Sequence, residues 1–306
     1  MTVPAGVERD FPLARLTTVR AGGPAELYSR PVTEERLLEL LSWAASEGHP
    51  VEVVGSGSNL LVSDAGVPGL VLKLDGELTR IERAGTRVVC GGGARLPSAA
   101  AQVARWGLGG LEFGINIPGT VGGAVRMNAN AYGGELGRVL ESVRVCSSTG
   151  VDVRAPGKLG FAYRSSNLQP GEVVSEATFG LHEADPEEVK ATMAGMRERR
   201  REAQPSGIKT FGSTFVNPDP ARSDGRTAGQ LLEAAGCQGL QVGGARLSPK
   251  HANFVENAGD ATTADVLALM AEARRRVHER FGIALEPEVQ VLGDVEWPSN
   301  WDLAAT

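Results

Sequence analysis

The pattern of hydrophobic and polar positions predicts a chain that mixes helices with strands. Residues 34–47 repeat hydrophobic side chains at a helical spacing, with Thr33 placed as the N-cap and Gly48 at the end. Glu34 and Glu35 fall in the first turn, where negative charge favours the helix dipole. The hydrophobic face is predicted to contain Leu37, Leu41, Ala44 and Ala45.

Short hydrophobic runs between glycine-bearing turns predict several strands in the first part of the chain. These strands are predicted at residues 51–55, 69–74, 87–92, 140–147 and 173–180. A short helix is predicted at residues 97–106, and the turn-forming, charged stretch 182–188 indicates a domain boundary. The pattern therefore favours an α+β region followed by a second domain.

The C-terminal part of the chain predicts two longer helices and a strand. Residues 186–203 predict a charged helix, and Thr262 with Asp265 has the spacing of a capping box before the second one. The buried face of the second helix is predicted to contain Val266, Met270, Ala273, Val277 and Phe281. Residues 285–293 alternate as a strand does, and the tail after them contains two tryptophans for which the pattern predicts no partner.

Length and composition are those of an ordinary globular protein. A chain of 306 residues exceeds what one hydrophobic core usually holds, so we expect two or more domains. Hydrophobic residues make up 42% and charged residues 22%, which argues against extensive disorder. The net charge of −6 provides no general attraction to nucleic acid or anionic membranes, so we expect neither as a partner.

The cysteines and histidines show no metal-ligand spacing. Cys90, Cys146 and Cys237 lie far apart without a CxxC pair, and we expect them to be buried free thiols. The four histidines form no constellation with them, so no metal site is predicted. Charged residues near the start and the lack of a long apolar run lead us to expect a reduced, cytoplasmic protein. The sequence does not reveal the oligomeric state.

The segment from Gly114 to Glu135 is rich in glycine without being repetitive. Small residues cluster at its centre, and asparagines and a tyrosine follow. Such a cluster indicates either unusual backbone angles or a ligand that approaches the main-chain N–H groups closely. The simpler interpretation is a loop between core elements, and the segment alone does not decide between them.

A second glycine-bearing loop, GSGSNLL at residues 55–61, follows a predicted strand. It fails the dinucleotide-binding pattern GxGxxG, because Leu60 occupies the third glycine position and residues 62–69 do not predict a helix. Asp75 lies at a suitable distance for a ribose contact, but one acidic residue at that spacing is common. The loop nevertheless offers several N–H and hydroxyl donors for a diphosphate.

Several segments together resemble a known family. With TVRAGGPAE (18–26) and IPGTVGGA (117–124), the GSGSNLL loop resembles the FAD-binding domain of vanillyl-alcohol oxidase and para-cresol methylhydroxylase flavoproteins. The order of those segments, MNANAYGGE (127–135), YRSS (163–166), GSTFVNP (212–218), LSPKHANFVEN (247–257) and LEPEVQVLG (285–293) is similar to the UDP-N-acetylenolpyruvoylglucosamine reductase family. The combination is specific, although no single segment is.

The resemblance implies a fold class and a domain division. It implies an α+β protein whose FAD-binding region of two subdomains covers residues 1–183, divided near residue 75, followed by a smaller substrate-binding domain. That substrate-binding domain is expected at residues 184–293, with a C-terminal tail at 294–306. The short spacing between YRSS and GSTFVNP is similar to the shorter subclass of the family.

The resemblance also implies the reaction. The family reduces UDP-N-acetylglucosamine enolpyruvate to UDP-N-acetylmuramate in peptidoglycan precursor synthesis, using noncovalently bound FAD and NADPH as co-substrate. Hydride passes from NADPH to the flavin and then to the methylene carbon of the substrate. A proton must then reach the adjacent carbon of the enolic intermediate.

The family's catalytic positions correspond here to Arg164, Ser213 and Glu288. Arg164 offers a permanent charge and forked donors to the carboxylate and enolate oxygens, although an arginine is more simply a surface ion-pair partner. Ser213 is expected to donate the proton, although it is more simply a turn residue. Glu288 is expected to act as acid/base or polarising group, although the strand pattern alone turns it toward solvent, and Glu286 is the alternative if the register differs.

The remaining site residues also follow from the resemblance. We expect FAD contacts from Gly55, Ser56, Gly57, Ser58, Asn59, Leu60, Gly119, Thr120, Gly122 and Gly123. Substrate contacts are expected from Tyr163, Arg201 and Asn217, although an arginine near a helix end is more simply solvated. His251 and Asn253 are interpreted as structural.

The sequence departs from the family pattern at three places. Asn116 and Asn130 stand where glycine is usual, and asparagine tolerates left-handed backbone better than most residues. YRSS lacks the aspartate that often follows the arginine. These departures leave the FAD contacts of both asparagine-bearing loops and the orientation of Arg164 open.

Two other functions remain as alternatives. An oxidase with the same FAD fold would act on a hydroxylated small molecule and pass electrons to oxygen. A flavin or nucleotide sensor would bind its ligand without turnover, but it would not need the arginine, serine and glutamate set.

Overall fold

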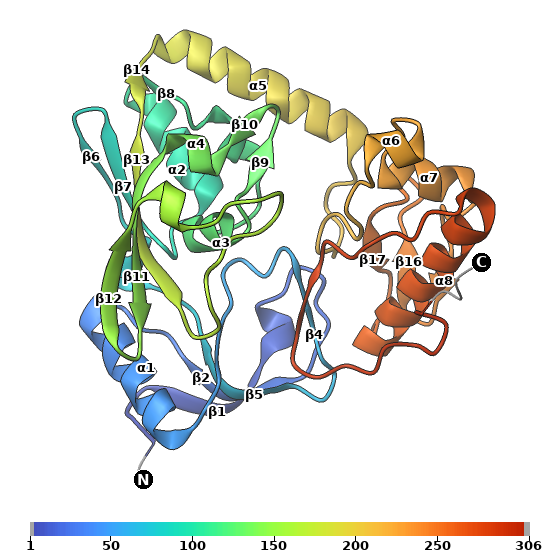
Figure 1. The fold of residues 1–306 in the computed structure, drawn as a ribbon, viewed down its shortest axis with the longest axis horizontal. Helices are drawn as coiled ribbons and strands as arrows, with labels where there is room; N and C mark the ends of the chain where they lie inside the picture. The colour runs from blue at the N-terminus through green and yellow to red at the C-terminus, as the bar shows by residue number, and fades with distance from the viewer. Residues whose placement is uncertain (1–2, 303–306) are drawn as a thin grey trace. The chain divides into compact units, whose positions relative to one another are not determined.

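The computed structural model describes residues 3–302, and their contacts divide the chain into two compact units (Figure 1). Unit 1 contains residues 1–10, 26–56 and 68–202, and unit 2 contains residues 11–25, 57–67 and 203–306. Each unit therefore combines segments that are distant in sequence. Loop 55–61 crosses the division after Ser56.

Unit 1 contains most of the regular structure. Its helices are α1 (Glu34–Glu47), α2 (Leu96–Arg105), α3 (Val121–Arg126), α4 (Leu136–Val139) and α5 (Pro186–Ala203), with 3-10 turns at Gly76–Thr79, Glu112–Asn116 and Pro156–Lys158. Its strands are β1 (Val7–Pro12), β2 (Pro24–Ser29), β3 (Val51–Val53), β5 (Val67–Leu72), β6 (Ile81–Ala84), β7 (Arg87–Gly91), β8 (Leu108–Gly109), β9 (Asn130–Ala131), β10 (Gly134–Glu135), β11 (Leu140–Ser147), β12 (Gly150–Arg154), β13 (Val173–Gly180) and β14 (His182–Glu183). The ends of β1, β2, β5 and α5 extend past the division.

The first sheet of unit 1 has the strand order β1-β2-β5-β3, and α1 packs with it. Thr33 caps α1 by accepting the N–H of Arg36, as predicted, and Gly48 ends it in the left-handed conformation. The buried face contains Leu37, Leu40, Leu41 and Ala44. The prediction for Ala45 was wrong: this residue is exposed, because the helical turn places Leu40 on the buried face instead.

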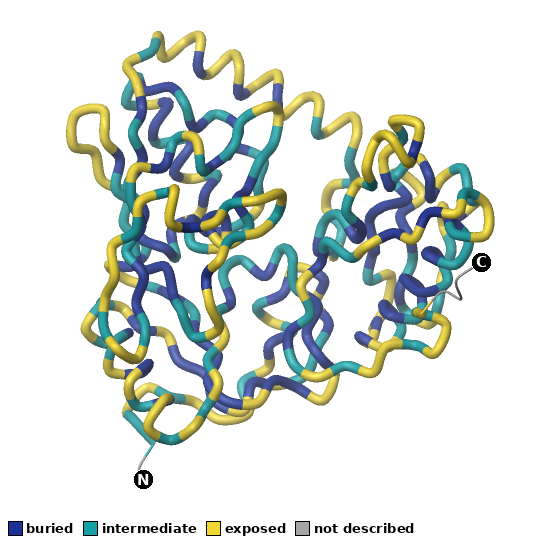
Figure 2. The backbone as a smooth tube through the Cα atoms, viewed as in Figure 1, coloured by how far each residue is buried: buried dark blue, intermediate teal, exposed yellow. Residues whose placement is uncertain are grey.

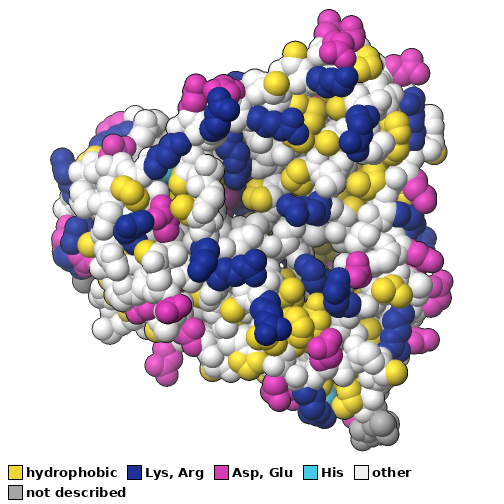
Figure 3. Space-filling model, turned by 180° about the vertical axis from the view of Figure 1, so that it is seen from behind, with side chains coloured by type: hydrophobic (Ala, Val, Ile, Leu, Met, Phe, Trp, Pro, Cys, Tyr) yellow, Lys and Arg dark blue, Asp and Glu magenta, His cyan; other side chains and the backbone are white. Residues whose placement is uncertain are grey.

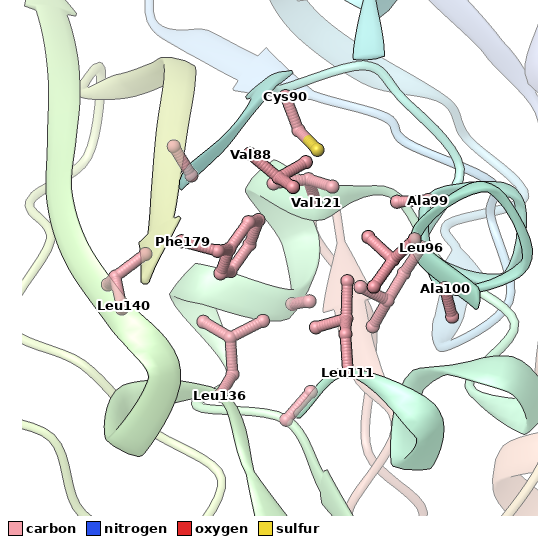
Figure 4. Close-up of a cluster of buried hydrophobic side chains, with 14 of the residues drawn as sticks. Val88, Cys90, Leu96, Ala99, Ala100, Leu111, Val121, Leu136, Leu140 and Phe179 are labelled. Carbon is pink, nitrogen blue, oxygen red and sulfur yellow. The ribbon is translucent and has the colours of Figure 1, made fainter. Parts of the chain in front are cut away.

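The second sheet of unit 1 is antiparallel and has the order β12-β11-β13-β7-β6. Figure 4 shows Phe179 of β13 projecting into a cluster that includes Val121 of α3 and Leu96 of α2. The same cluster contains Val189, Met193 and Met196 of α5. These contacts and the division assign α5 to unit 1, whereas the division expected from the sequence begins a new domain at residue 184.

Unit 2 is smaller and is built around one long helix. Its elements are a 3-10 turn at Leu13–Arg15, α6 (Pro220–Ser223), α7 (Ala228–Ala234), α8 (Thr263–Phe281), β4 (Leu60–Val62), β15 (Gln241–Val242), β16 (Ala245–Leu247), β17 (Val255–Asn257) and β18 (Gln290–Leu292). The predicted capping box of Thr262 and Asp265 is present at the start of α8. The core of this unit contains Val266, Met270, Ala273 and Val277, as predicted, with Phe281 partly buried against it.

The expected α+β class is confirmed, and Figure 2 shows buried segments in both units. Helix α5 and strands β11 and β13 have the predicted bounds. The strand predicted at residues 285–293 is shorter, since only Gln290–Leu292 pair with β4, and Glu288 precedes it in irregular backbone. Residues 62–69 form no helix, as expected. The three cysteines are buried and free.

The tail after β18 packs on α8 through its second tryptophan. Arg274 of α8 is buried and lies 4.7 Å from the ring centroid of Trp301, and it also donates to the carbonyl of Trp301. The rings of Trp297 and Trp301 lie with their centroids 4.2 Å apart and are tilted by 41°. Residues 303–306 of the predicted tail lie outside the described residues.

Charges of both signs are interspersed with hydrophobic side chains on the face seen in Figure 3. Among residues 3–302, no helix combines the length and the hydropathy that crossing a membrane requires.

Candidate active site

In loop 55–61, the carbonyls of Gly55, Gly57 and Asn59 each accept a hydrogen bond from the protein. The carbonyl of Gly55 accepts from Lys73 Nζ at 2.6 Å. The carbonyl of Gly57 accepts from the N–H of Thr18 at 3.0 Å and from its hydroxyl at 3.1 Å. The carbonyl of Asn59 accepts from the N–H of Gln290 at 3.0 Å. Four donor groups from three residues therefore fix the carbonyls of Gly55, Gly57 and Asn59.

The N–H groups of the same loop remain available. A trans peptide points its C=O and N–H in opposite directions, so fixing a carbonyl turns the next N–H away from the donor. Within residues 3–302, the N–H groups of Ser56, Gly57, Ser58 and Asn59 donate no hydrogen bond. Since consecutive unpaired N–H groups form an anion-binding concavity, this loop fits the diphosphate of FAD.

Gly57 is required at the centre of the loop. Its φ of +62° lies in the left-handed region, and a Cβ there would stand 2.0 Å from the carbonyl oxygen of Leu16. Leu16 lies just before the TVRAGGPAE segment and Thr18 begins it, so this part of the chain packs against Gly57 and bonds to its carbonyl. This packing explains why the two motifs occur together.

In the second predicted FAD loop, at Gly119–Gly123, most of the backbone N–H groups donate hydrogen bonds to other groups of the protein. Val121 donates to the carbonyl of Ala94 at 2.8 Å, and Gly122 donates to that of Gly92 at 2.7 Å. Thr120 caps α3 by accepting the N–H of Gly123 at 3.3 Å. The N–H groups of Val121 and Gly122 are therefore already paired within the protein.

The glycines of this second loop have different surroundings. A Cβ on Gly122 would lie 3.0 Å from the carbonyl oxygen of Gly92, so this glycine permits close packing of α3. A Cβ on Gly119 would meet nothing within 4 Å. A Cβ on Gly55 would lie 2.5 Å from Thr120 Oγ1, which shows that the two predicted FAD loops adjoin within unit 1.

Arg164 lies at the tip of a two-residue hairpin turn in unit 1. Ala162 and Ser165 pair across the turn, with N–H to O distances of 3.2 and 3.3 Å. Arg164 has a φ of +55°, which is unfavourable for a side chain with a Cβ and recurs at functional sites. Its Nη1 donates to the carbonyl of Asn130 at 3.3 Å, and its guanidinium lies 5.3 Å from the ring centroid of Tyr163.

Ser213 belongs to unit 2, in an extended segment held on both sides. It forms a bridge with Phe254, and its neighbour Thr214 donates to the carbonyl of Asn253 at 2.8 Å. The preceding Gly212 has a φ of +86°. No described residue hydrogen-bonds to the Ser213 hydroxyl, so the backbone is fixed while the hydroxyl can serve a ligand.

Glu288 lies next to the Ser213 segment. Its N–H donates to the carbonyl of Thr214 at 2.8 Å, and its carbonyl accepts from Asn59 Nδ2 at 3.1 Å. The structure thus brings Ser213, Glu288 and the second half of loop 55–61 together within unit 2. The alternative residue, Glu286, is exposed and forms an ion pair of 3.7 Å with Arg274.

Asn253 organises this part of unit 2 more than the sequence pattern indicated. Its Oδ1 accepts from the N–H of Phe215 at 2.9 Å, and its Nδ2 donates to the carbonyl of Phe215 at 2.8 Å. Its own N–H donates to Nδ1 of His251 at 3.2 Å. Burial lowers the pKa of His251 below 6.5, which keeps that nitrogen an acceptor at neutral pH. The only signal in the sequence was the LSPKHANFVEN segment itself.

Of the predicted substrate residues, Tyr163 and Arg201 belong to unit 1 and Asn217 belongs to unit 2. Tyr163 is exposed at the hairpin tip, and Asn217 in unit 2 uses its Oδ1 to accept the N–H of Ala228 at the start of α7. Arg201 in unit 1 is exposed and pairs with Glu198 at 2.5 Å. The preceding Arg200 is the more buried arginine of this run, and burial lowers its pKa.

Asn116 and Asn130 fit the backbone without left-handed angles of their own. Asn116 Nδ2 donates to the hydroxyl of Tyr132 at 2.9 Å, and its carbonyl accepts from Arg200. The positive φ angles fall instead on Asn128 (+39°) and Tyr132 (+52°). The adaptation therefore comes from neighbouring residues and from a side-chain contact.

Family models match most of the chain. The model described as "UDP-N-acetylenolpyruvoylglucosamine reductase, C-terminal domain" matches residues 204–292, and one described as "FAD binding domain" matches residues 25–155. The second match confirms the FAD-binding fold expected from the sequence.

Individual relatives agree with these matches over nearly the full length. UDP-N-acetylenolpyruvoylglucosamine reductase 2 of Symbiobacterium thermophilum is 45% identical over 296 residues, covering 96% of this chain and 94% of the relative. The reductase of Anaeromyxobacter dehalogenans is 46% identical over 286 residues, covering 94% and 85%. The crystal structure of UDP-N-acetylenolpyruvylglucosamine reductase from Thermus caldophilus is similar with a TM-score of 0.81 and 39% identity, covering 95% of this chain and 99% of that chain.

Proposed function

The chain belongs to the UDP-N-acetylenolpyruvoylglucosamine reductase family, and we propose that it reduces UDP-N-acetylglucosamine enolpyruvate to UDP-N-acetylmuramate with NADPH. It is an FAD-dependent oxidoreductase of peptidoglycan precursor synthesis. We place the reaction in the cytosol, since NADPH is the reductant and all three cysteines are free thiols.

The residues of loop 55–61 fit the cofactor. When bound, FAD supplies hydride acceptance from NADPH and hydride delivery to the substrate. The N–H groups of Ser56, Gly57, Ser58 and Asn59 would hold its diphosphate, and the fixed carbonyls of Gly55 and Gly57 orient those of Ser56 and Ser58. Preorganised donors are effective because they lose little conformational entropy on binding.

Arg164 is proposed to bind the substrate carboxylate. Hydride addition at the methylene carbon leaves an electron pair that spreads through the adjacent carbon onto this carboxylate. A guanidinium stabilises that charge through two parallel N–H donors and stays protonated throughout. The left-handed backbone of Arg164 fixes the direction in which the side chain leaves the turn.

Ser213 is proposed to donate the final proton. The Ser213 O–H bond breaks as a C–H bond forms at the carbon next to the carboxylate, which restores neutrality at that carbon. Because a hydroxyl is a weak acid, transfer depends on close placement and on the strong basicity of the enolic carbon. The fixed backbone around Ser213 supplies that placement.

Glu288 is proposed to stabilise the enolic form and to return a proton to Ser213. Its backbone hydrogen bonds to Thr214 and Asn59 keep it beside the serine segment. This network, which joins the predicted proton donor, the glutamate and the second half of the FAD loop within unit 2, is the observation that best supports the proposal.

Half-reactions of the purified protein test the function. Under anaerobic conditions, NADPH should bleach the yellow flavin, and the enolpyruvyl UDP-sugar should restore its colour with one equivalent of product. If that substrate leaves the flavin reduced, the proposed function is wrong. Rapid return of colour with oxygen and peroxide would instead indicate an oxidase, and binding without any reduction would indicate a sensor.

A further inference from the structure

Lys73 is a partly buried lysine that bonds to the FAD loop. None of the roles predicted from the sequence includes it. It follows β5, and its backbone N–H donates to the carbonyl of Ser29 at 3.0 Å. Its ammonium donates to the carbonyl of Gly55 at 2.6 Å. The side chain therefore connects the end of a core strand to the first residue of the loop.

The ammonium of Lys73 forms no salt bridge with a carboxylate among residues 3–302. The adjacent Asp75 is engaged with Arg30 at 2.5 Å. Burial lowers the pKa of Lys73 below 10.5, and the charge of Arg30 lowers it further. Asp75 raises this pKa by less than Arg30 lowers it, and Arg95 has the smallest effect, which also lowers it. A desolvated cation among other cations costs free energy in the free protein, so an anion at this place would relieve it.

We propose that Lys73 is a cofactor-positioning residue, which orients the Gly55–Ser56 peptide for the FAD diphosphate and supplies a compensating positive charge. The Gly55 carbonyl points toward the ammonium, so the Ser56 N–H of the same planar peptide points away from it. That N–H is one of the donors without a partner within the described chain. Removing the ammonium releases the carbonyl, and the N–H loses its fixed direction.

The inference rests on the proposed use of this loop for FAD. It predicts that Lys73 contributes through its charge and hydrogen bond rather than through its apolar stem. Lys73→Met keeps a similar stem without the ammonium, and Lys73→Arg keeps a charge and donors. Lys158→Met is a matched control, since Lys158 is an exposed lysine of the same unit.

The test is FAD titration into the apoprotein of each variant at low and high salt, with the thermal midpoint of each apoprotein measured alongside. We expect K73M to weaken FAD binding by about 10- to 100-fold and to flatten its salt dependence, while K73R stays within about fivefold. The apoprotein midpoint of K73M should be unchanged or higher. The control K158M should match the wild type in both measurements.

Two results would overturn the inference. FAD binding by K73M within twofold of the wild type would remove any role for the ammonium. A fall in the thermal midpoint of the K73M apoprotein that is large enough to explain its weaker FAD binding would show that Lys73 only stabilises the fold. If the wild type itself bound no FAD, the proposed function would fail, which is a different result from equal binding by wild type and K73M.

Discussion

The two units hold their candidate catalytic residues in different ways. In unit 1, Arg164 occupies a left-handed position at the tip of a short turn, and its guanidinium donates to the carbonyl of Asn130. In unit 2, backbone and amide hydrogen bonds from Asn253, Thr214 and Asn59 hold the segments of Ser213 and Glu288. Proton transfer requires close contact, whereas a charge stabiliser acts over several ångströms, so the proton donation proposed for Ser213 depends more strongly on a fixed backbone than the charge stabilisation proposed for Arg164.

The largest expected effect is that of Ser213→Ala. General acid catalysis contributes about a hundred- to ten-thousandfold, so reoxidation of the reduced flavin by the substrate should slow by that factor. Reduction of the flavin by NADPH should be unchanged, and rapid-mixing absorbance resolves the two steps. Equal slowing of both steps, or slowing of NADPH oxidation alone, would contradict the role given to Ser213.

Arg164→Ala should slow the same substrate step by about a hundred- to a thousandfold, because it removes stabilisation of the developing charge. Arg164→Lys keeps the charge without the fork and should lose less. Since the residue is only partly buried at a turn, the free energy of unfolding should change by about 0.5 kcal/mol or less in both variants. A large loss in the free energy of unfolding with normal turnover would show that Arg164 stabilises unit 1 rather than the substrate charge.

The two FAD loops should respond differently to an added methyl group. Gly57→Ala forces a left-handed alanine against the Leu16 carbonyl, and we expect a loss of about 2–4 kcal/mol in the free energy of unfolding of the apoprotein. Gly119→Ala enters open space and should change that value by about 0.5 kcal/mol or less. Denaturant unfolding measures both, and equal effects would show that the loops are not built differently.

The smallest expected difference between the units concerns the contribution of one ion pair in each to the free energy of unfolding. Glu34 of α1 bonds to Arg144 at 2.6 Å and to Ser175 at 2.7 Å, across distant segments of unit 1, and the Arg144 hydrogen bond lowers its pKa. Glu272 pairs within α8, and hydrogen bonds from Arg275 and Arg276 lower its pKa to about 2. At pH 7, Glu34→Gln should cost about 1–3 kcal/mol and Glu272→Gln about 0.5–1 kcal/mol.

The pH dependence has a defined sign. Both folded pKa values lie below the ordinary 4.5, so each carboxylate stabilises the fold above that pH and loses its contribution as the pH falls toward its folded pKa. The difference between wild type and each glutamine variant should therefore shrink below about pH 4.5. A difference that grows on acidification would contradict the assigned ion pairs.

The regular elements were largely predictable because local chemistry specifies them. Thr33 before an amphipathic run and Thr262 with Asp265 set the starts of α1 and α8, where capping satisfies N–H groups that any helix leaves open. The residues near Glu288 were less predictable. They alternate like a strand, but the pairing with β4 begins only at Gln290, and Glu288 pairs with Thr214 instead.

The sequence by itself determined the fold class, the family and the candidate residues, since capping, periodicity and an ordered motif set are properties of the chain alone. Only the tertiary structure decided how two similar glycine-rich loops differ: one leaves its N–H groups unpaired, and the other uses them for packing. It also decided that Lys73 lies against Gly55 and that Asn253 fixes the Ser213 segment. The physical reason is that the direction of each N–H and C=O depends on partners distant in sequence, which no local pattern encodes.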